Sequence, residues 1–93
     1  MHMPMTVVRK RDIETVSGTW VRVGYDPSTS TVRYGHPFQG AARDVVSGAI
    51  RSGGVVTLVR EMGSAHALYH VALPIGSGRA DRYYVGPLTI STS

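Results

Sequence analysis

Arginine and aromatic side chains occur close together at three places in the chain, and this combination has a defined chemistry. Trp20 and Arg22 are two residues apart in a strand-like segment, which would place them on the same side of it. Arg33 and Tyr34 are adjacent in the next such segment. The third group lies near the C-terminal end and consists of Arg79, Arg82, Tyr83 and Tyr84. Such groups suit single-stranded nucleic acid, because aromatic rings stack on its bases while guanidinium groups neutralise its phosphates.

We therefore predict a small, basic, non-catalytic binding module for an anionic partner, with nucleic acid as the first candidate. The predicted phosphate contacts are Arg22, Arg33, Arg79 and Arg82. The predicted stacking surface consists of Trp20, Tyr83 and Tyr84. A competing interpretation is that the rings cover the core, with Trp20 at its centre, because the tyrosines of a thin domain commonly do so.

Two histidines have a spacing that suits a metal ion on a helix but not on a strand. His66 and His70 are four residues apart in a segment that alternates polar and apolar residues. At about 3.3 Å per residue in a strand, they would lie about 13 Å apart. Two ring nitrogens that each need to be about 2.0 Å from one zinc ion cannot span this distance. We predict no metal site and no cofactor.

The sequence contains no residue pattern typical of nucleophilic catalysis. The chain has no cysteine, and no serine lies in a Gly-x-Ser-x-Gly turn between a strand and a helix. Ser77, in the sequence Gly-Ser-Gly, lies between two strand-like segments. Arg79 and Arg82 follow it closely, so this loop is a candidate for anion binding only. We assign no catalytic residue.

Acid-base catalysis on RNA is an alternative function. Glu61, Arg82 and either His66 or His70 follow a helical segment in the second half of the chain. In element order and residue types this half resembles the small microbial ribonucleases, whose sheet presents a glutamate base, an arginine and a histidine acid. The resemblance implies a metal-independent enzyme in which these residues surround the scissile phosphate. The chain departs from that pattern because both histidines precede the arginine.

Strand-like segments that could position these residues make up most of the chain. They cover residues 5–8, 13–16, 19–25, 31–34, 55–61, 65–73 and 82–90. Residues 26–30 and 62–64 have turn composition, and we expect residues 75–80 to form a flexible loop. Gly86-Pro87 interrupts the last segment, and because proline donates no hydrogen bond, this strand is predicted to be bulged or to lie at a sheet edge.

The apolar period changes to that of a helix between residues 38 and 50. Apolar residues three and four apart are Phe38, Ala41, Ala42, Val45, Val46, Ala49 and Ile50. Pro37 suits the first turn of a helix, and Gly53-Gly54 suits its exit. The pattern predicts a single helix over about residues 37–51.

Together these elements predict an α+β fold. The helix would pack on a twisted, mostly antiparallel sheet of five or six strands, in the order β-β-(β)-α-β-β-β. We expect one domain over residues 5–91, a disordered or cloning-derived N-terminus at residues 1–4 and a tail at residues 92–93.

A sheet covered by one helix leaves one face and its edges for another protein. Leu68 and Trp20 would contribute to that face. The alternative prediction is therefore a protein-interaction or inhibitory module, with homodimerisation as one form of it.

Composition agrees with a small basic protein. The 93 residues include ten Lys and Arg against six Asp and Glu, which gives a net charge of +4. Every basic residue except Lys10 is an arginine. Binding of anionic partners would explain this bias, and so would codon usage. No apolar run approaches the ~18 residues of a membrane span, and no secretory signal is evident. We predict a cytoplasmic protein without a membrane partner.

Overall fold

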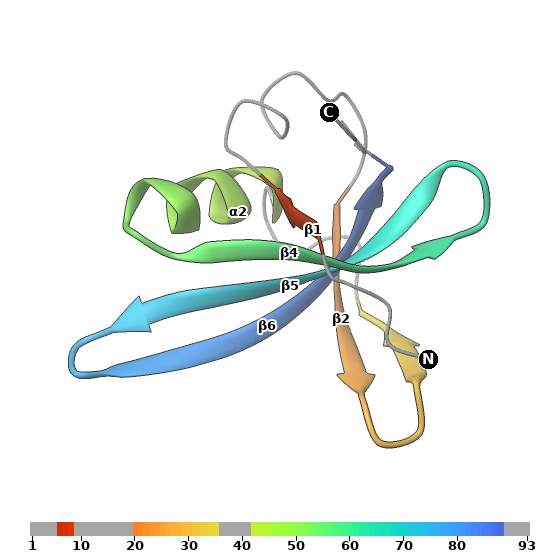
Figure 1. The fold of residues 1–93 in the computed structure, drawn as a ribbon, viewed down its shortest axis with the longest axis horizontal. Helices are drawn as coiled ribbons and strands as arrows, with labels where there is room; N and C mark the ends of the chain where they lie inside the picture. Colours follow the sequence, from red (N-terminus) through yellow and green to blue (C-terminus); the bar gives the residue numbers. More distant parts are fainter. Residues whose placement is uncertain (1–5, 9–19, 36–41, 89–93) are drawn as a thin grey trace.

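The computed structural model describes residues 6–8, 20–35 and 42–88 (Figure 1). The strand predicted at residues 13–16, the helical turn predicted at residues 37–41 and the two predicted chain ends lie outside these ranges. The described elements are β1 (Thr6–Val8), β2 (Val21–Asp26), β3 (Thr31–Tyr34), α2 (Ala42–Arg51), β4 (Val55–Met62), β5 (His66–Ile75) and β6 (Gly78–Pro87).

The strands form one antiparallel sheet of six strands in the order β1-β4-β5-β6-β2-β3. Two hairpins, β4–β5 and β5–β6, make its centre, and β2–β3 continues it beyond β6. The sheet is strongly twisted, so that the β2–β3 hairpin runs steeply across the direction of β5 and β6 (Figure 1). Within the described residues the predicted α+β class, with a helix against an antiparallel sheet, is confirmed.

The helix packs on one side of the sheet, which we call the helix face. Val46 and Ala49 of α2 are buried there together with Val56 of β4 and with Tyr69 and Val71 of β5. The helix ends as predicted, because Gly53 adopts a φ of +86° and Gly54 donates its N–H to the carbonyl of Ala49 at 2.7 Å.

The opposite side of the sheet, which we call the open face, carries a second apolar cluster. Val23 of β2, Leu68 of β5 and Val85 of β6 are buried in it. Leu68 was expected to be an exposed contact for a protein partner, and this is wrong: it is 0 % exposed. The twist brings side chains of β2 and β6 over it, so the open face is partly closed by the sheet itself.

Two local predictions are also corrected. The loop expected at residues 75–80 is a tight turn, since β5 runs to Ile75 and β6 begins at Gly78, with Gly76 at a φ of +54°. The strand that contains Gly86 lies between β5 and β2, and not at an edge. Proline is tolerated there because Pro87 is the last residue of β6, where the ladder ends.

Candidate nucleic-acid interface

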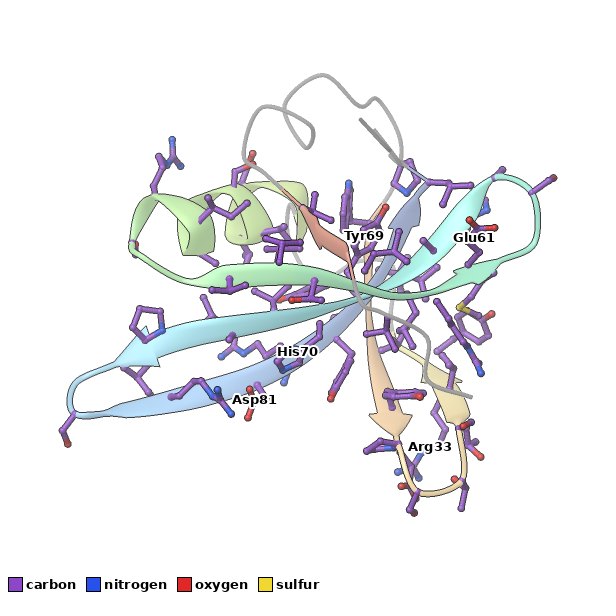
Figure 2. The ribbon with its side chains drawn as sticks, viewed as in Figure 1. Arg33, Glu61, Tyr69, His70 and Asp81 are labelled. Atoms are coloured by element: carbon purple, nitrogen blue, oxygen red, sulfur yellow. The ribbon has the colours of Figure 1, made fainter. Side chains whose placement is uncertain are left out.

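Three polar side chains from the three central strands lie next to one another on the open face. Thr57, His70 and Tyr83 lie side by side across β4, β5 and β6, because Thr57 pairs with His70 and His70 pairs with Tyr83. Tyr69, the residue before His70, belongs to the helix-face core. Figure 2 shows the two side chains on opposite sides of the sheet. The alternation of β5 thus puts Tyr69 on the helix face and His70 on the open face.

A histidine, an aspartate and an arginine are joined on this face. The Nε2 atom of His70 lies 2.9 Å from Oδ1 of Asp81. Nε of Arg79 lies 3.2 Å from the same oxygen. The side chains of His70, Asp81 and Arg79 are 20 %, 42 % and 67 % exposed, so the guanidinium keeps most of its surface in solvent. Asp81 therefore accepts a hydrogen bond from His70 and forms an ion pair with Arg79, and the exposed part of the Arg79 guanidinium can contact a further anion.

Aromatic rings extend this group toward the β2–β3 hairpin. The ring of Tyr83 lies with its centroid 5.0 Å from that of His70, at 44°. On its other side it lies 5.0 Å from the ring of Tyr25, at 56°. The guanidinium carbon of Arg60 lies 5.9 Å from the centroid of Tyr25, within the range of a cation–π contact. Rings and guanidinium groups thus follow one another from Arg60 to Arg79, and we call this series the ring–arginine row.

The environment of Tyr83 keeps its hydroxyl protonated. Burial raises the pKa of Tyr83 above its usual 10.0, and the negative charge of Asp81 and the neighbouring Tyr25 raise the pKa further. A neutral tyrosine presents a ring without charge repulsion toward phosphates.

Two hollows adjoin the ring–arginine row, and His70 and Arg79 line both of them. The first, of about 480 Å³, has Val55, Ala72 and Pro74 among its walls, and we call it the apolar hollow. The second, of about 380 Å³, is lined by Tyr25, Pro27, Val59, Asp81 and Tyr83 besides His70 and Arg79. We call it the Asp81 hollow. Both volumes fall in the range of small-ligand pockets, roughly 300–1,000 Å³.

A third hollow lies farther along the open face. It has a volume of about 320 Å³ and is lined by Val21, Tyr34, Met62, His66 and Val85. Tyr34 is 69 % exposed, so its ring is accessible at the sheet edge formed by β3. Hollows and rings therefore occur along much of the open face.

The predicted phosphate contacts are divided between the two faces. Arg79 lies on the open face. Arg22 pairs with the core residue Tyr84, Arg82 pairs with Val71 of the helix-face core, and Arg33 pairs with Gly24. By strand alternation these three arginines lie on the helix face, so the structure does not gather the four guanidinium groups into one surface. Figure 2 shows Arg33 far from His70 and Asp81.

The predicted stacking rings are divided too. Tyr83 lines the Asp81 hollow, whereas Trp20 and Tyr84 are 4 % and 2 % exposed and belong to the helix-face core. Trp20 packs on Tyr69 with ring centroids 4.8 Å apart, and its buried Nε1–H has no acceptor among the described residues. Trp20 is therefore a core ring, as the competing interpretation predicts. The candidate interface contains neither Trp20 nor Tyr84.

The residues of the ribonuclease-like hypothesis do not surround one position. Glu61 pairs with Ala67 and Arg82 pairs with Val71, which places both on the helix face. His66 and His70 lie on the open face. Figure 2 shows Glu61 away from His70 and Asp81. Among the described residues, no group of three or more His, Asp or Glu could hold a metal ion.

Arg60 and Tyr25 were missed at the level of the sequence, and Arg60 was missed for a specific reason. Simple alternation from Leu58 puts Arg60 on the helix face. A β-bulge between Leu58 and Arg60 shifts the register, so that Arg60 pairs with Leu68 and lies on the open face. Val59, the extra residue, packs on the open-face cluster as well. No residue type in this segment signals the bulge.

No protein-family model matches the sequence, and no curated protein and no solved structure shows significant similarity to it. In the part of the chain that the structure describes, no helix has the length and apolar character needed to cross a membrane.

Proposed function

We propose that this chain is a non-catalytic module that binds single-stranded nucleic acid on the open face of its sheet. The observation that carries the proposal is the ring–arginine row, in which Arg60, Tyr25, Tyr83, His70 and Arg79 follow one another beside the two hollows. Rings that stack on bases and guanidinium groups that pair with phosphates are the two contacts this ligand needs.

Arg79 is in the position that a phosphate between two bases would require. It lines both hollows, and its side chain is 67 % exposed. A base in each hollow would leave the connecting phosphate near this guanidinium group. His70 lines both hollows too.

The remaining arginines support the proposal at longer range. Arg22, Arg33 and Arg82 contribute to the net charge of +4, although they lie on the helix face. A net positive charge raises the encounter rate with a polyanion and is screened by salt. We assign these three residues to attraction, and Arg60 and Arg79 to direct contact. A cytoplasmic location belongs to the same proposal.

Fluorescence anisotropy with labelled single- and double-stranded oligonucleotides, at several salt concentrations, tests the function. We expect single strands to bind more tightly, with log K falling against log salt by about 0.7 for each phosphate contacted. Arg79→Ala should weaken binding and reduce the slope by about that amount. Tyr83→Ala should cost about 1–3 kcal/mol of binding free energy, the range of one stacked base.

Two arginine variants serve as controls. Arg51→Ala removes an exposed cation from the last turn of α2 and should leave the salt slope unchanged. Arg33→Ala reports on the helix face, so a loss as large as that of Arg79→Ala would place the interface there and contradict our choice of face. A weak response to every oligonucleotide that does not depend on salt would reject nucleic acid. The protein-interaction function, including a homodimer, would then be the remaining candidate.

A further inference from the structure

We propose that the Asp81 hollow is a base-selective slot, which accepts nucleobases with an exocyclic amino group and disfavours uracil and thymine. The inference rests on the proposed function and adds a specificity to it. It starts from the presence of a carboxylate inside an otherwise aromatic and basic surface, where a general phosphate-binding site would have none.

The walls of the slot suit a flat aromatic ligand. The half-buried rings of Tyr25 and Tyr83 line it, together with Pro27 and Val59. Its volume of about 380 Å³ is at the small end of ligand pockets. Tyr83 lies between the rings of His70 and Tyr25, with centroids 5.0 Å away on each side, so residues of the sheet itself form this wall of the slot.

Asp81 determines which edge of a ligand can enter. Its Oδ1 atom is engaged by Nε2 of His70 and Nε of Arg79. Its Oδ2 atom has no hydrogen-bond partner among the described residues, and the side chain is 42 % exposed. An ionised carboxylate only accepts hydrogen bonds, and it repels phosphate. The group that meets Oδ2 must therefore be a hydrogen-bond donor, and in a nucleic acid such donors are on the bases and not on the phosphates.

The nucleobases differ in whether they carry an amino group that can donate a hydrogen bond to Oδ2. Cytosine, adenine and guanine each carry an amino group, whereas thymine offers a carbonyl oxygen where cytosine and adenine offer NH₂. In uracil and thymine the single N–H of the pairing edge lies between two carbonyl oxygens, which the carboxylate repels. The contacts of Asp81 with His70 and Arg79 both use Oδ1, which leaves Oδ2 as the oxygen that can meet a base.

The apolar hollow provides an internal comparison. Its walls include Val55, Thr57, Ala72 and Pro74, and none of the described residues that line it is a carboxylate. A base there would be held by burial and by its connection to the next phosphate. The hydrogen-bonding groups on the edge of the base would not affect its binding. Selectivity should therefore be limited to one position of the bound strand.

The experiment compares oligo(dC), oligo(dA) and oligo(dT) of equal length by anisotropy, with wild-type protein and two variants. Because a hydrogen bond to a charged group contributes about 1.5–3 kcal/mol, we expect wild type to bind oligo(dC) and oligo(dA) roughly tenfold or more tightly than oligo(dT). Asp81→Asn replaces the acceptor by an amide that both donates and accepts, so it should bind the three strands with similar affinity.

The matched control is Asp44→Asn, which removes the same charge from an exposed position in the first turn of α2. It should strengthen binding to all strands slightly and keep the preference for oligo(dC) and oligo(dA) over oligo(dT). If Asp44→Asn abolished the preference as Asp81→Asn does, the effect would come from net charge and the slot would be rejected.

A second measurement does not depend on the folding of a variant. NMR spectra of the wild-type protein with cytidine or uridine monophosphate should show larger shifts at Tyr83 and Asp81 for the cytidine ligand. Equal binding of the three oligonucleotides, or equal shifts, would overturn the slot while the proposed function stands. Absence of binding to every oligonucleotide would overturn the proposed function and the slot with it.

Discussion

Tyr83 is the residue at which burial, charge and binding meet. It lies between two rings, faces Asp81 and lines the slot. The sequence predicts both Tyr83 and Trp20, which are aromatic, as stacking residues, but Trp20 lies in the core. Ring type and proximity to arginine are the same in both cases, so only the pairing of the strands decides which ring remains accessible.

The raised pKa of Tyr83 makes stability depend on pH in the alkaline range. The folded protein keeps this proton at pH values where the unfolded chain, with a pKa near 10, loses it. The contribution is fully present below about pH 10 and is lost as the pH rises from there through the raised pKa. Urea unfolding between about pH 8 and pH 11 should show wild type losing stability faster than Tyr83→Phe. Parallel curves would mean that Tyr83 is not desolvated in the fold.

At the scale of the elements, β6 is central because it joins the β4–β5 hairpin to the β2–β3 hairpin. Trp20, just before β2, packs against β6 at Gly86, where a Cβ atom would lie only 2.5 Å from Cε3 of the indole ring. The absence of a side chain at Gly86 therefore lets the tryptophan approach the strand. The glycine that the sequence marked as an interruption is a packing site.

Gly86→Ala should destabilise the protein by about 1–3 kcal/mol or more, the usual cost of overpacking a core. Gly24→Ala is the matched control, since it also lies in a strand and its Cβ would meet only Arg33 at ordinary contact distances of 3.9–4.0 Å. We expect its free energy of unfolding to change by less than about 1 kcal/mol. Thermal or urea unfolding followed by circular dichroism measures both, and equal effects would contradict the proposed packing.

The strands themselves were largely predictable, and their neighbours were not. The alternation in β5, the exit of α2 and the turn at Gly63 are local features, and local chemistry specifies them. The pairing of β1 with β4 and of β2 with β6 joins residues far apart in sequence. Whether Arg22 and Arg79 share a face depends on these pairings, so the composition of the interface could not be derived from spacing alone.

The whole molecule has apolar clusters on both sides of its sheet. The cluster under α2 was expected, whereas the cluster around Leu68 takes up a face that the sequence left free for a partner. This second cluster supports the surface that carries the ring–arginine row, because Tyr25, Val59 and Tyr83 pack against it. The proposed binding surface therefore adjoins residues on which stability depends.

Leu68→Ala should cost about 2–5 kcal/mol, the range for truncating a fully buried leucine. Ile75→Ala is the comparison, since Ile75 is 57 % exposed and its truncation should change stability by no more than about 0.5 kcal/mol. Chemical denaturation gives both values. A small effect of Leu68→Ala would show that the open-face cluster is packed less tightly than described. The ring–arginine row would then have no packed cluster to support it.

The bulge in β4 also affects how related sequences should be compared. Val59 is an extra residue opposite the β5 pairs, and the residues after it keep their partners independently of it. A related chain that lacks this one residue would return to regular pairing, with Arg60 still opposite Leu68 and Glu61 still opposite Ala67. A one-residue gap at this point of an alignment therefore leaves both charges on the sides they occupy now, and what it removes is the Val59 wall of the Asp81 hollow.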